Sequence, residues 1–447
     1  MLIGRVPPRA WALLAVALVL RLVVVVTTFD TPTTLDPADF SRNGWSFAQG
    51  HGLPPSNRAP AGGPSAFRPP AYPVFLGNVY AVVGREAPAI ARLVQTVLGT
   101  LAVGLIGLIA ARIWGRRVGM LALGIAAIAP PLVILSTALV SEALFIPVML
   151  TAVLAALEAR RSSRPLRWAI VTGVLVGVAE LTRTNALVLL PALGLALWTA
   201  QPGSPRRALV RVTAMVAAAV LTVAPWTVRN WLRFHAFVPV STEVGYTLAG
   251  TYNAASRADT HWPAVWKEAD HGASREYGAI LFYASTQRWD ERRLGDRLLA
   301  AAIRDIGRDP AYVLQVGAWN TIRMFHLGEL DFAVKNLRDT DIPRLPALLA
   351  IYGFYPLAIL ALAGIGTGLV RRAPAWMWLV PVSLASAVFV TGFIRFRSPI
   401  DPFLVMLAAQ AVAAARDRRR PDGHSPHGGS RRIRLSHADE RVAHTVR

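Results

Sequence analysis

The chain has 447 residues, of which 54% are hydrophobic and 16% charged, well below the roughly 25% charged residues usual in soluble domains. Its net charge of +21 does not indicate nucleic-acid binding, because only two of the 47 basic residues are lysines and the arginines gather between apolar runs. The absence of cysteine excludes disulfides, zinc–thiolate sites and thiol catalysis. These features predict an integral membrane protein.

Ten apolar runs are long enough to cross a hydrocarbon core of about 30 Å. The first follows basic residues as a signal peptide would, but it lacks a small-residue cleavage site and is interpreted as a retained helix. The predicted spans are 10–28, 88–111, 118–130, 132–157, 166–182, 184–200, 210–228, 346–370, 374–392 and 399–415.

The arginines predict the orientation of these spans. They cluster in the connections 112–117, 158–167, 201–211 and 371–374 and in the tail after 415, which all fall on one side if the spans alternate. By the positive-inside rule that side is the cytoplasm, so both termini are expected there, in the inner (plasma) membrane. The connections 29–87 and 229–345 mix acidic and basic residues and are expected outside.

This pattern divides the chain into four parts. We expect an N-terminal transmembrane module at 1–228 with its first external loop at 29–87, an external helical segment at 229–345, C-terminal transmembrane helices at 346–415 and a disordered basic tail at 416–447. The tail contains much Gly, Pro, Ser and charge and few large apolar residues, so it cannot bury a core.

The stretch LDPADFSRNGWSFAQGHG, residues 35–52, predicts a short interfacial helix in the first external loop. Asp36 precedes Pro37, a residue favoured at the first helical position, and Asp39 stands where a capping box has its second acid. Phe40, Gly44, Phe47 and Ala48 share one face, and two glycines end the pattern after about 13 residues, too few to span. Asp36 could serve only as the cap of this helix, or it could carry chemistry.

Charged residues within or beside the spans indicate a polar cavity. Arg21 lies in the first span, Glu142 in the fourth, and Arg183 at the outer end of the fifth. Such residues cost several kcal/mol in a bilayer unless they are paired or face a cavity. Together they predict a cavity that opens outward and suits a substrate with an apolar tail and an anionic head.

Seven segments resemble, in content and order, the bacterial branch of glycosyltransferase family 39 in the GT-C superfamily, which includes protein O-mannosyltransferases and the lipid A aminoarabinose transferase. The resemblance runs from about Arg21 to Phe403, and its most specific pieces are RPPAYP and PWTVRN followed by FVPVST. The segments are DPADFSRNGWSFAQGHG, AFRPPAYPVFLG, ARLVQTVLGT, LVSEALF, GVAELTRTNAL, APWTVRNWLRFHAFVPVSTEVGYTL and FIRFRSPIDPFL.

The resemblance implies an all-α, polytopic GT-C-like bundle and an enzyme. Such an enzyme moves a sugar from a polyprenyl phosphate carrier to an acceptor hydroxyl on the external face, with inversion at the anomeric carbon. The acid of its first external loop is the proposed general base, which corresponds to Asp36 here, with Asp39 beside it. The family often has tyrosine where this chain has Phe40.

The chemistry of this reaction selects the remaining residues. A departing phosphate monoester needs positive charge rather than protonation, and arginine offers a fork that matches phosphate oxygens. No divalent metal or other cofactor is required by the sequence, which has no His or Asp cluster with metal-ligand spacing. The expected site comprises Asp36 and Asp39 as catalytic acids and, for substrate binding, Arg21, Arg68, Tyr72, Glu142, Arg183, Arg229, Asn230, Arg395 and Arg397.

Alternatives remain open at this point. A flippase or transporter of a lipid-linked sugar would also place arginines near a membrane cavity, although it would not need an external carboxylate. A non-catalytic scaffold would explain the spans but not the charges within them. Among transferases, the sugar could be mannosyl, arabinosyl or another, and the acceptor a protein hydroxyl, a glycolipid or a wall glycan.

Overall fold

The computed structural model describes residues 7–201, 203–268 and 275–418, and all secondary structure in these ranges is helical. Within these described ranges, six helices are long and apolar enough to cross a membrane. They are α1 (Pro8–Thr27), α4 (Pro88–Trp114), α7 (Glu142–Ala159), α8 (Pro165–Thr182), α10 (Pro205–Phe234) and α17 (Arg344–Ile365). The predicted all-α polytopic membrane architecture is thereby confirmed.

The other predicted spans correspond to shorter helices and to α19, which is as long as α7 and α8 but carries charged residues at both ends. They are α5 (Arg116–Ile128), α6 (Pro130–Leu135), η1 (Ala186–Val188), α9 (Leu189–Trp198), α18 (Ala375–Ala385), η3 (Ser386–Phe389) and α19 (Asp401–Arg418). Two single 3₁₀ turns complete this part of the chain, η2 (Leu369–Arg372) and η4 (Ile394–Arg397). The tight turn expected at 182–185 is present between α8 and η1.

The expected continuous span at 132–157 is wrong. Its first residues form α6, which follows α5 after a break at Ala129, and the turn at 136–141 separates α6 from α7. Pro130 and Pro131 occupy the first positions of α6, where a missing N–H costs nothing, so the prolines start a helix here instead of separating two spans.

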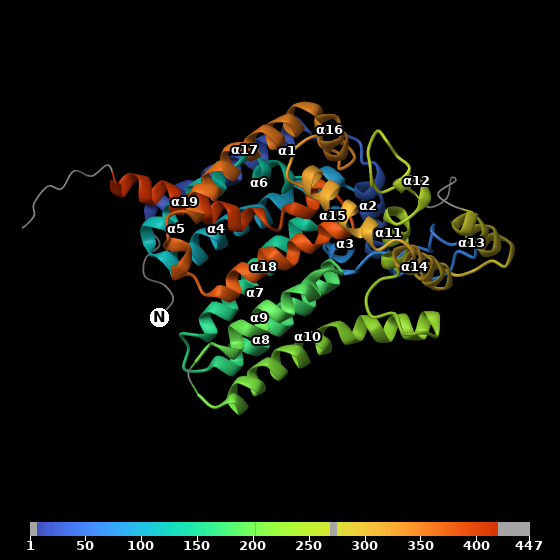
Figure 1. Cartoon of the computed structure of the whole chain (residues 1–447), viewed down its shortest axis with the longest axis horizontal. Coiled ribbons are helices and arrows are strands. Elements are labelled where there is room, and N and C mark those ends of the chain that lie inside the picture. The colour runs from blue at the N-terminus through green and yellow to red at the C-terminus, as the bar shows by residue number, and fades with distance from the viewer. Residues whose placement is uncertain (1–6, 202, 269–274, 419–447) are drawn as a thin grey trace, which may run out of the picture.

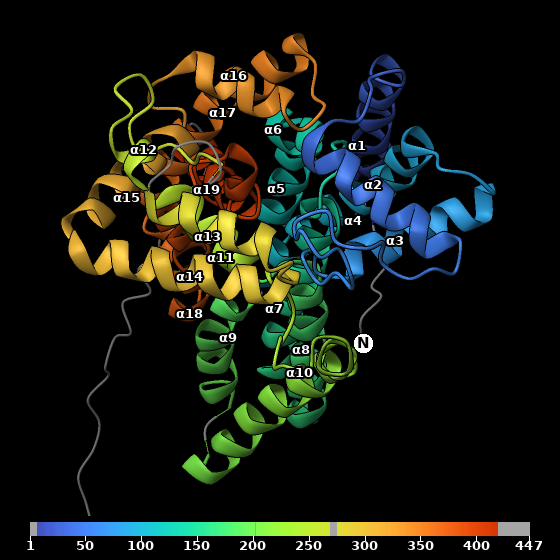
Figure 2. The same cartoon turned by 90° about the vertical axis from the view of Figure 1, so that its right-hand side faces the viewer.

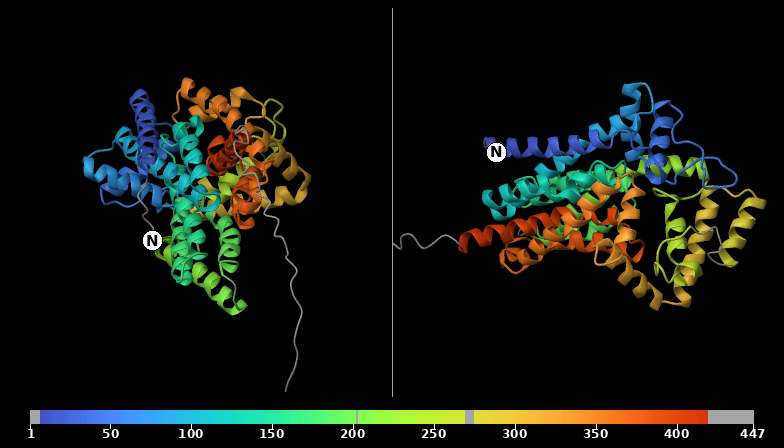
Figure 3. Two further views of the ribbon diagram at one scale, coloured as in Figure 1. Left: turned by 90° about the vertical axis from the view of Figure 1, so that its left-hand side faces the viewer. Right: turned by 90° about the horizontal axis from the view of Figure 1, so that it is seen from above.

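The helices outside the bundle gather at one end of the molecule. They are α2 (Leu35–Ala48), α3 (Ala71–Val83), α11 (Glu243–Thr251), α12 (Ala254–Arg257), α13 (Arg275–Thr286), α14 (Glu291–Arg308), α15 (Ala311–Met324) and α16 (Leu330–Arg338). In Figure 1 they lie on the right, and Figure 3 shows that α1 begins and α19 ends at the opposite end of the bundle. This arrangement is consistent with the predicted topology.

The interfacial helix expected after the first span is α2. Its apolar face packs on α3 so closely that a Cβ on Gly44 would lie 2.7 Å from the Cβ of Leu76, and one on Gly77 would lie 2.6 Å from the ring of Phe47. Phe40 of the same face is buried. The small residues therefore fix how α2 sits on α3, and with it the position of the acids near the start of α2.

Close helix packing also shapes the membrane bundle. A Cβ on Gly173 of α8 would lie 2.1 Å from the carbonyl oxygen of Met215 in α10, so only glycine permits this crossing. Residue 229, expected to begin the external segment, lies inside α10, which continues to Phe234. At the other boundary α19 continues to Arg418, and the rest of the predicted disordered tail, 419–447, lies outside the described residues.

Candidate active site

A cavity of about 810 Å³ lies at the end of the molecule that carries α11 and α16. Its walls come from α2, the loop before α3, α11, the segment 259–268, α16 and residues 391–396. Among the described residues, six positively and six negatively charged side chains line it: Arg42, Arg58, Arg68, Lys267, Lys335 and Arg395 against Asp36, Asp39, Glu243, Asp259, Glu268 and Asp339. The lining therefore has no net charge.

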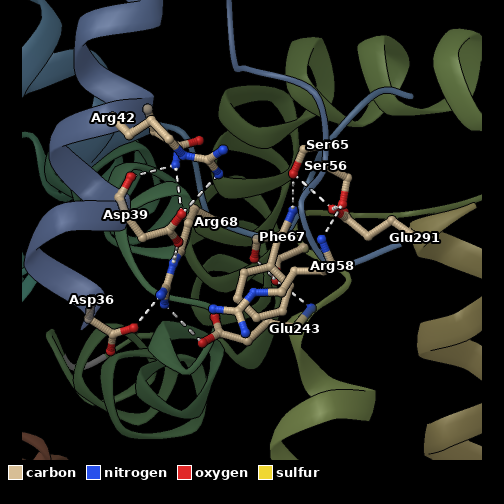
Figure 4. A network of polar contacts seen from close by, with 12 residues as sticks. Asp36, Asp39, Arg42, Ser56, Arg58, Ser65, Phe67, Arg68, Glu243 and Glu291 are labelled. Carbon is tan, nitrogen blue, oxygen red and sulfur yellow. Dashed lines mark hydrogen bonds and ion pairs between the residues drawn. The ribbon is translucent and has the colours of Figure 1, made fainter. Parts of the chain in front are cut away.

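Arg68 is the centre of the charged cluster (Figure 4). Its guanidinium is buried and contacts three carboxylates: Nη2 pairs with Asp36, Nε donates to Asp39 Oδ2 at 2.8 Å, and Nη1 lies 3.3 Å from Glu243 Oε1. The ring of Phe40 lies 4.7 Å from the guanidinium carbon. Although burial lowers the pKa of Arg68, the three carboxylates raise it above its ordinary value.

Asp36 is held between two arginines. One carboxylate oxygen pairs with Arg68 and the other with Nη2 of Arg395. Burial alone raises the pKa of Asp36, but the attraction of both guanidiniums outweighs burial and holds the pKa below its ordinary value. The side chain keeps 29% exposure to the cavity, so Asp36 is an ionised and accessible carboxylate.

The interpretation of Asp36 as a helix cap is wrong. Helix α2 begins at Leu35, its N-cap is Thr34, and the side chain of Thr34 accepts no capping hydrogen bond. The Oδ1 atom of Asp341 instead accepts from the backbone N–H of Thr34 at 3.0 Å. Both oxygens of Asp36 are thus directed to the arginines of the cavity.

The ion pairs continue from the cavity toward the membrane bundle. Nε of Arg395 lies 3.8 Å from Oε1 of Glu142, the buried first residue of α7, and Glu142 also pairs with Arg183 at the end of α8. The guanidinium of Arg183 lies 4.5 Å from the ring of Phe396. Glu142 and Arg183 do not line the cavity, and of the two only Glu142 forms an ion pair with Arg395 among the described residues.

Glu291 connects the segments that carry Arg68 and Glu243. Its carboxylate is fully buried at the start of α14 and accepts four hydrogen bonds. The donors are Ser56 Oγ at 2.5 Å, Ser65 Oγ at 2.8 Å, Ala66 N at 2.9 Å and Thr242 Oγ1 at 2.6 Å. One carboxylate therefore fixes the loop just before Arg68 to the residue just before Glu243, as Figure 4 shows in part.

Two residues expected to bind substrate are buried elsewhere. The hydroxyl of Tyr72 donates to Oε1 of Gln95, away from the cavity. Arg21 donates to Ser136 Oγ at 3.0 Å and to the carbonyls of Ala17 and Leu132, within a separate narrow pocket inside the bundle. The hydrogen bonds of Tyr72 and Arg21 are made to other side chains or to the backbone inside the bundle. The predicted depth of these residues in the membrane therefore did not indicate contact with the cavity.

Three further residues also have structural partners. Arg229 donates to the carbonyl of Ser65 at 2.9 Å, and Asn230 donates to the carbonyls of Val238 and Val240. Arg397 pairs with Asp401 at 3.0 Å inside the core. The prediction that Arg183, Arg229 and at least one of Arg395 and Arg397 line a common cavity is wrong for Arg183 and Arg229, whereas Arg395 does line the cavity.

Sequence reasoning missed Glu243 and the segment 259–268. Glu243 directly follows the recognised FVPVST motif, and its position at the start of a helix after Ser and Thr was a usable signal. Burial raises the pKa of Glu243, and the nearby Arg68 only partly offsets this. The segment 259–268 carries no motif, and only its two tryptophans set it apart.

The chain was compared with known proteins. Residues 67–228 match a family model described as dolichyl-phosphate-mannose-protein mannosyltransferase. No curated protein matches the chain in sequence.

Among solved structures, the oligosaccharyltransferase AglB from Archaeoglobus fulgidus, in complex with an inhibitory peptide and a dolichol-phosphate, is similar with a TM-score of 0.55 at 13% identity. The match covers 92% of this chain and 50% of that chain, so this chain spans about half the length of AglB. ArnT from Cupriavidus metallidurans, bound to undecaprenyl phosphate, is similar with a TM-score of 0.41 at 15% identity, over 91% of this chain and 78% of that chain.

The predicted fold class is confirmed by the likeness to AglB. The chain is a multi-pass membrane protein with the GT-C fold, and the family-model match lies within the part of the chain whose motifs resembled family 39. The match begins at Phe67, directly before the arginine at the centre of the charged cluster.

Proposed function

We propose that this chain, a multi-pass membrane protein with the GT-C fold, is a glycosyltransferase that moves a sugar from a polyprenyl phosphate carrier to an acceptor hydroxyl. The observation that carries the proposal is the position of Asp36, a carboxylate exposed to a large cavity and held between two arginines. The description of the matching family and the dolichol-phosphate in the AglB complex support a lipid-phosphate donor.

The arginines are proposed to hold the carrier phosphate. Guanidinium groups bind phosphate oxygens through paired, charge-assisted hydrogen bonds, and Arg68 and Arg395 already face the cavity. In the described structure carboxylates occupy both guanidiniums. Because these carboxylates already neutralise the arginines, an arriving phosphate must displace a carboxylate in order to bind. We propose that it displaces Asp36 from Arg68 and Arg395.

Asp36 is proposed as the general base. It accepts the proton of the acceptor hydroxyl while the oxygen forms a bond to the anomeric carbon from the face opposite the carrier. The bond from that carbon to the phosphate oxygen breaks, its electron pair stays on the phosphate, and the configuration inverts. The low pKa of Asp36 keeps its carboxylate ionised before the donor binds. When the phosphate takes over the two arginines, Asp36 loses their positive charge, so its pKa rises and it becomes a stronger base for the transfer step.

The location of the cavity supports a reaction on the external face of the inner (plasma) membrane. The cavity lies at the end of the bundle opposite the start of α1 and the end of α19, and the arginine-rich connections predict that those ends are cytoplasmic. A divalent metal is proposed to be unnecessary, because two guanidiniums can neutralise the departing monophosphate. Transfer that continues undiminished in EDTA is the expected result.

The proposal is tested by reconstitution of the full chain with polyprenyl phosphate mannose and polyprenyl phosphate arabinose, with release of polyprenyl phosphate as the measured product. Release by the wild type and its loss in Asp36→Asn would support the transferase. Movement of the intact sugar lipid between leaflets, without any release of polyprenyl phosphate, would support the flippase instead.

A further inference from the structure

The segment 259–267 forms a compact loop on the wall of the cavity. Its ends are joined by an ion pair of 2.6 Å between Asp259 and Lys267, and Oδ1 of Asp259 accepts from the backbone N–H of His261 and Trp262, each at 2.8 Å. Compact loops with closed ends are rigid surface elements that frequently carry function.

The same loop is anchored to the helices beneath it. The hydroxyl of Ser256 donates to the carbonyl of Val265 at 2.5 Å, and the backbone N–H of Lys267 donates to the carbonyl of Gly250 at 2.8 Å. Ala264 and Val265 are buried at its centre. The loop is therefore held in place before any ligand arrives.

Two tryptophans of this loop, Trp262 and Trp266, line the cavity. Trp262 packs edge to face on Phe332 of α16 at 5.8 Å, and Trp266 packs on Phe393 at 6.4 Å. The indole N–H of Trp262 has no hydrogen-bond partner within the described ranges of the chain. The indole nitrogen of Trp266 packs against Gly250 of α11, where an added Cβ would lie 2.1 Å from it. The wall thus offers fixed aromatic surface together with one unused hydrogen-bond donor, that of Trp262.

Trp262 and Trp266 line the same cavity as Asp36, Arg68 and Arg395. In Figure 2 the segment after α12 and helix α2 lie on opposite sides of α16, whose residues also line this cavity. A substrate that presents a hydroxyl to Asp36 therefore shares the cavity with the tryptophans, while the carrier phosphate is proposed to bind at Arg68 and Arg395.

The chemistry of the wall selects the substrate class. A sugar ring offers polarised C–H groups that pack on the electron-rich face of an aromatic ring, and its hydroxyls accept hydrogen bonds from indole N–H. A polyprenyl chain would leave the indole N–H of Trp262 without a partner, which is costly once water is displaced. The neighbouring charges are already paired, Lys267 with Asp259 and Lys335 with Asp339 at 2.6 Å each, so the wall favours a ligand without net charge.

We propose that Trp262 and Trp266 form an acceptor subsite for a neutral saccharide, so that the hydroxyl which receives the sugar belongs to a glycan and not to a protein. The inference rests on the proposed transfer reaction, because it assigns the acceptor of that reaction.

Binding is tested by saturation-transfer NMR on the full chain in lipid nanodiscs, with α-mannotriose, α-arabinotriose and a Ser/Thr-containing peptide as the probes. Transfer of saturation to a trisaccharide is expected, and its loss in Trp262→Ala/Trp266→Ala. The control Trp231→Ala changes a tryptophan on α10 that is 54% exposed and outside the cavity, and should bind like the wild type. Saturation of the peptide alone, or of none of the three probes, overturns the proposal.

Kinetics separate this inference from the proposed function. With the wild type active, the double variant should raise the KM of the glycan acceptor roughly tenfold and leave the KM of the donor unchanged, with partial recovery in Trp262→Phe/Trp266→Phe. A rise in the donor KM instead would mean that the wall holds the donor, and would overturn the acceptor subsite alone. A wild type that binds the trisaccharide but neither binds nor cleaves the lipid donor contradicts the proposed function.

Discussion

Asp36 and Arg395 are 359 residues apart in the chain, yet their side chains form an ion pair on the wall of one cavity. Arg68 holds the other carboxylate oxygen, so the carboxylate of Asp36 connects the loop before α3 to the last part of the chain. The predictions below follow from this pair and its neighbours.

Replacement of Asp36 by Asn should reduce sugar transfer by about a hundredfold to ten-thousandfold, the usual effect of losing a general base. The residue does not cap α2, and Asn keeps its size, so the variant should insert and bind carrier lipid. The control is Asp39→Asn, for which we expect a smaller loss, because Asp39 is bound to Arg68, Arg42 and Asn43. Full activity in Asp36→Asn would refute the assignment of the base, and loss only in Asp39→Asn would transfer the role to that residue.

Replacement of Arg395 by Lys should raise the donor KM by roughly tenfold. The single ammonium of lysine cannot pair with Asp36 and also form the two parallel hydrogen bonds that a guanidinium gives to a phosphate. Arg397→Lys is the matched control. Arg397 is buried against Asp401 and the carbonyl of Met324, so its replacement should lower the thermal stability and leave the donor KM of the folded protein unchanged. The reverse pattern would place the phosphate at Arg397.

Replacement of Arg229 by Ala should leave the affinity for carrier lipid within about twofold of the wild type and cost about 0.5–1.5 kcal/mol of stability, the usual worth of a hydrogen bond. The side chain ties α10 to the carbonyl of Ser65 and packs on Trp226, outside the cavity. The measurement pairs lipid binding with thermal unfolding. A large loss of affinity in a stable variant would return Arg229 to the phosphate site.

Replacement of Glu243 by Gln should change how stability depends on pH. Burial raises the pKa of Glu243 in the folded protein, so the folded state binds more protons than the unfolded state above the ordinary glutamate pKa of about 4.3. This contribution to stability is therefore present at low pH and is lost as the pH rises through the folded pKa.

Asp36 acts in the opposite direction, because its pKa is lowered and its contribution is lost as the pH falls. Apparent melting temperatures between pH 4 and 8 should show a smaller decline toward high pH in Glu243→Gln than in the wild type. Identical profiles in the two proteins would show that the carboxyl of Glu243 titrates normally.

A cysteine introduced at Glu268 should react with an impermeant thiol reagent in intact cells, since this exposed residue belongs to the segment predicted to be external. One introduced at Arg371, also exposed, should react only after lysis. The chain has no cysteine of its own, so each signal reports a single position. Labelling of position 268 only after lysis would contradict the predicted topology and place this segment in the cytoplasm.

The sequence by itself determined the features that arise from local pattern and composition. Apolar length gave the six long spans, and the spacing of Phe40, Gly44 and Phe47 gave the short helix that follows the first span. The family resemblance and the need for positive charge at a departing phosphate also placed Asp36, Arg68 and Arg395 among the expected site residues, and these three line one cavity.

Only the tertiary structure decided which of the expected charged residues meet. Arg395 and Arg397 look equivalent in the sequence, but they stand two positions apart in the four-residue 3₁₀ helix η4, which has three residues per turn, so they point to different sides. One side faces the cavity and the other faces Asp401 in the core. Sequence position fixes the depth of such a residue in the membrane, whereas rotation about the helix axis and the packing of distant segments fix its partner.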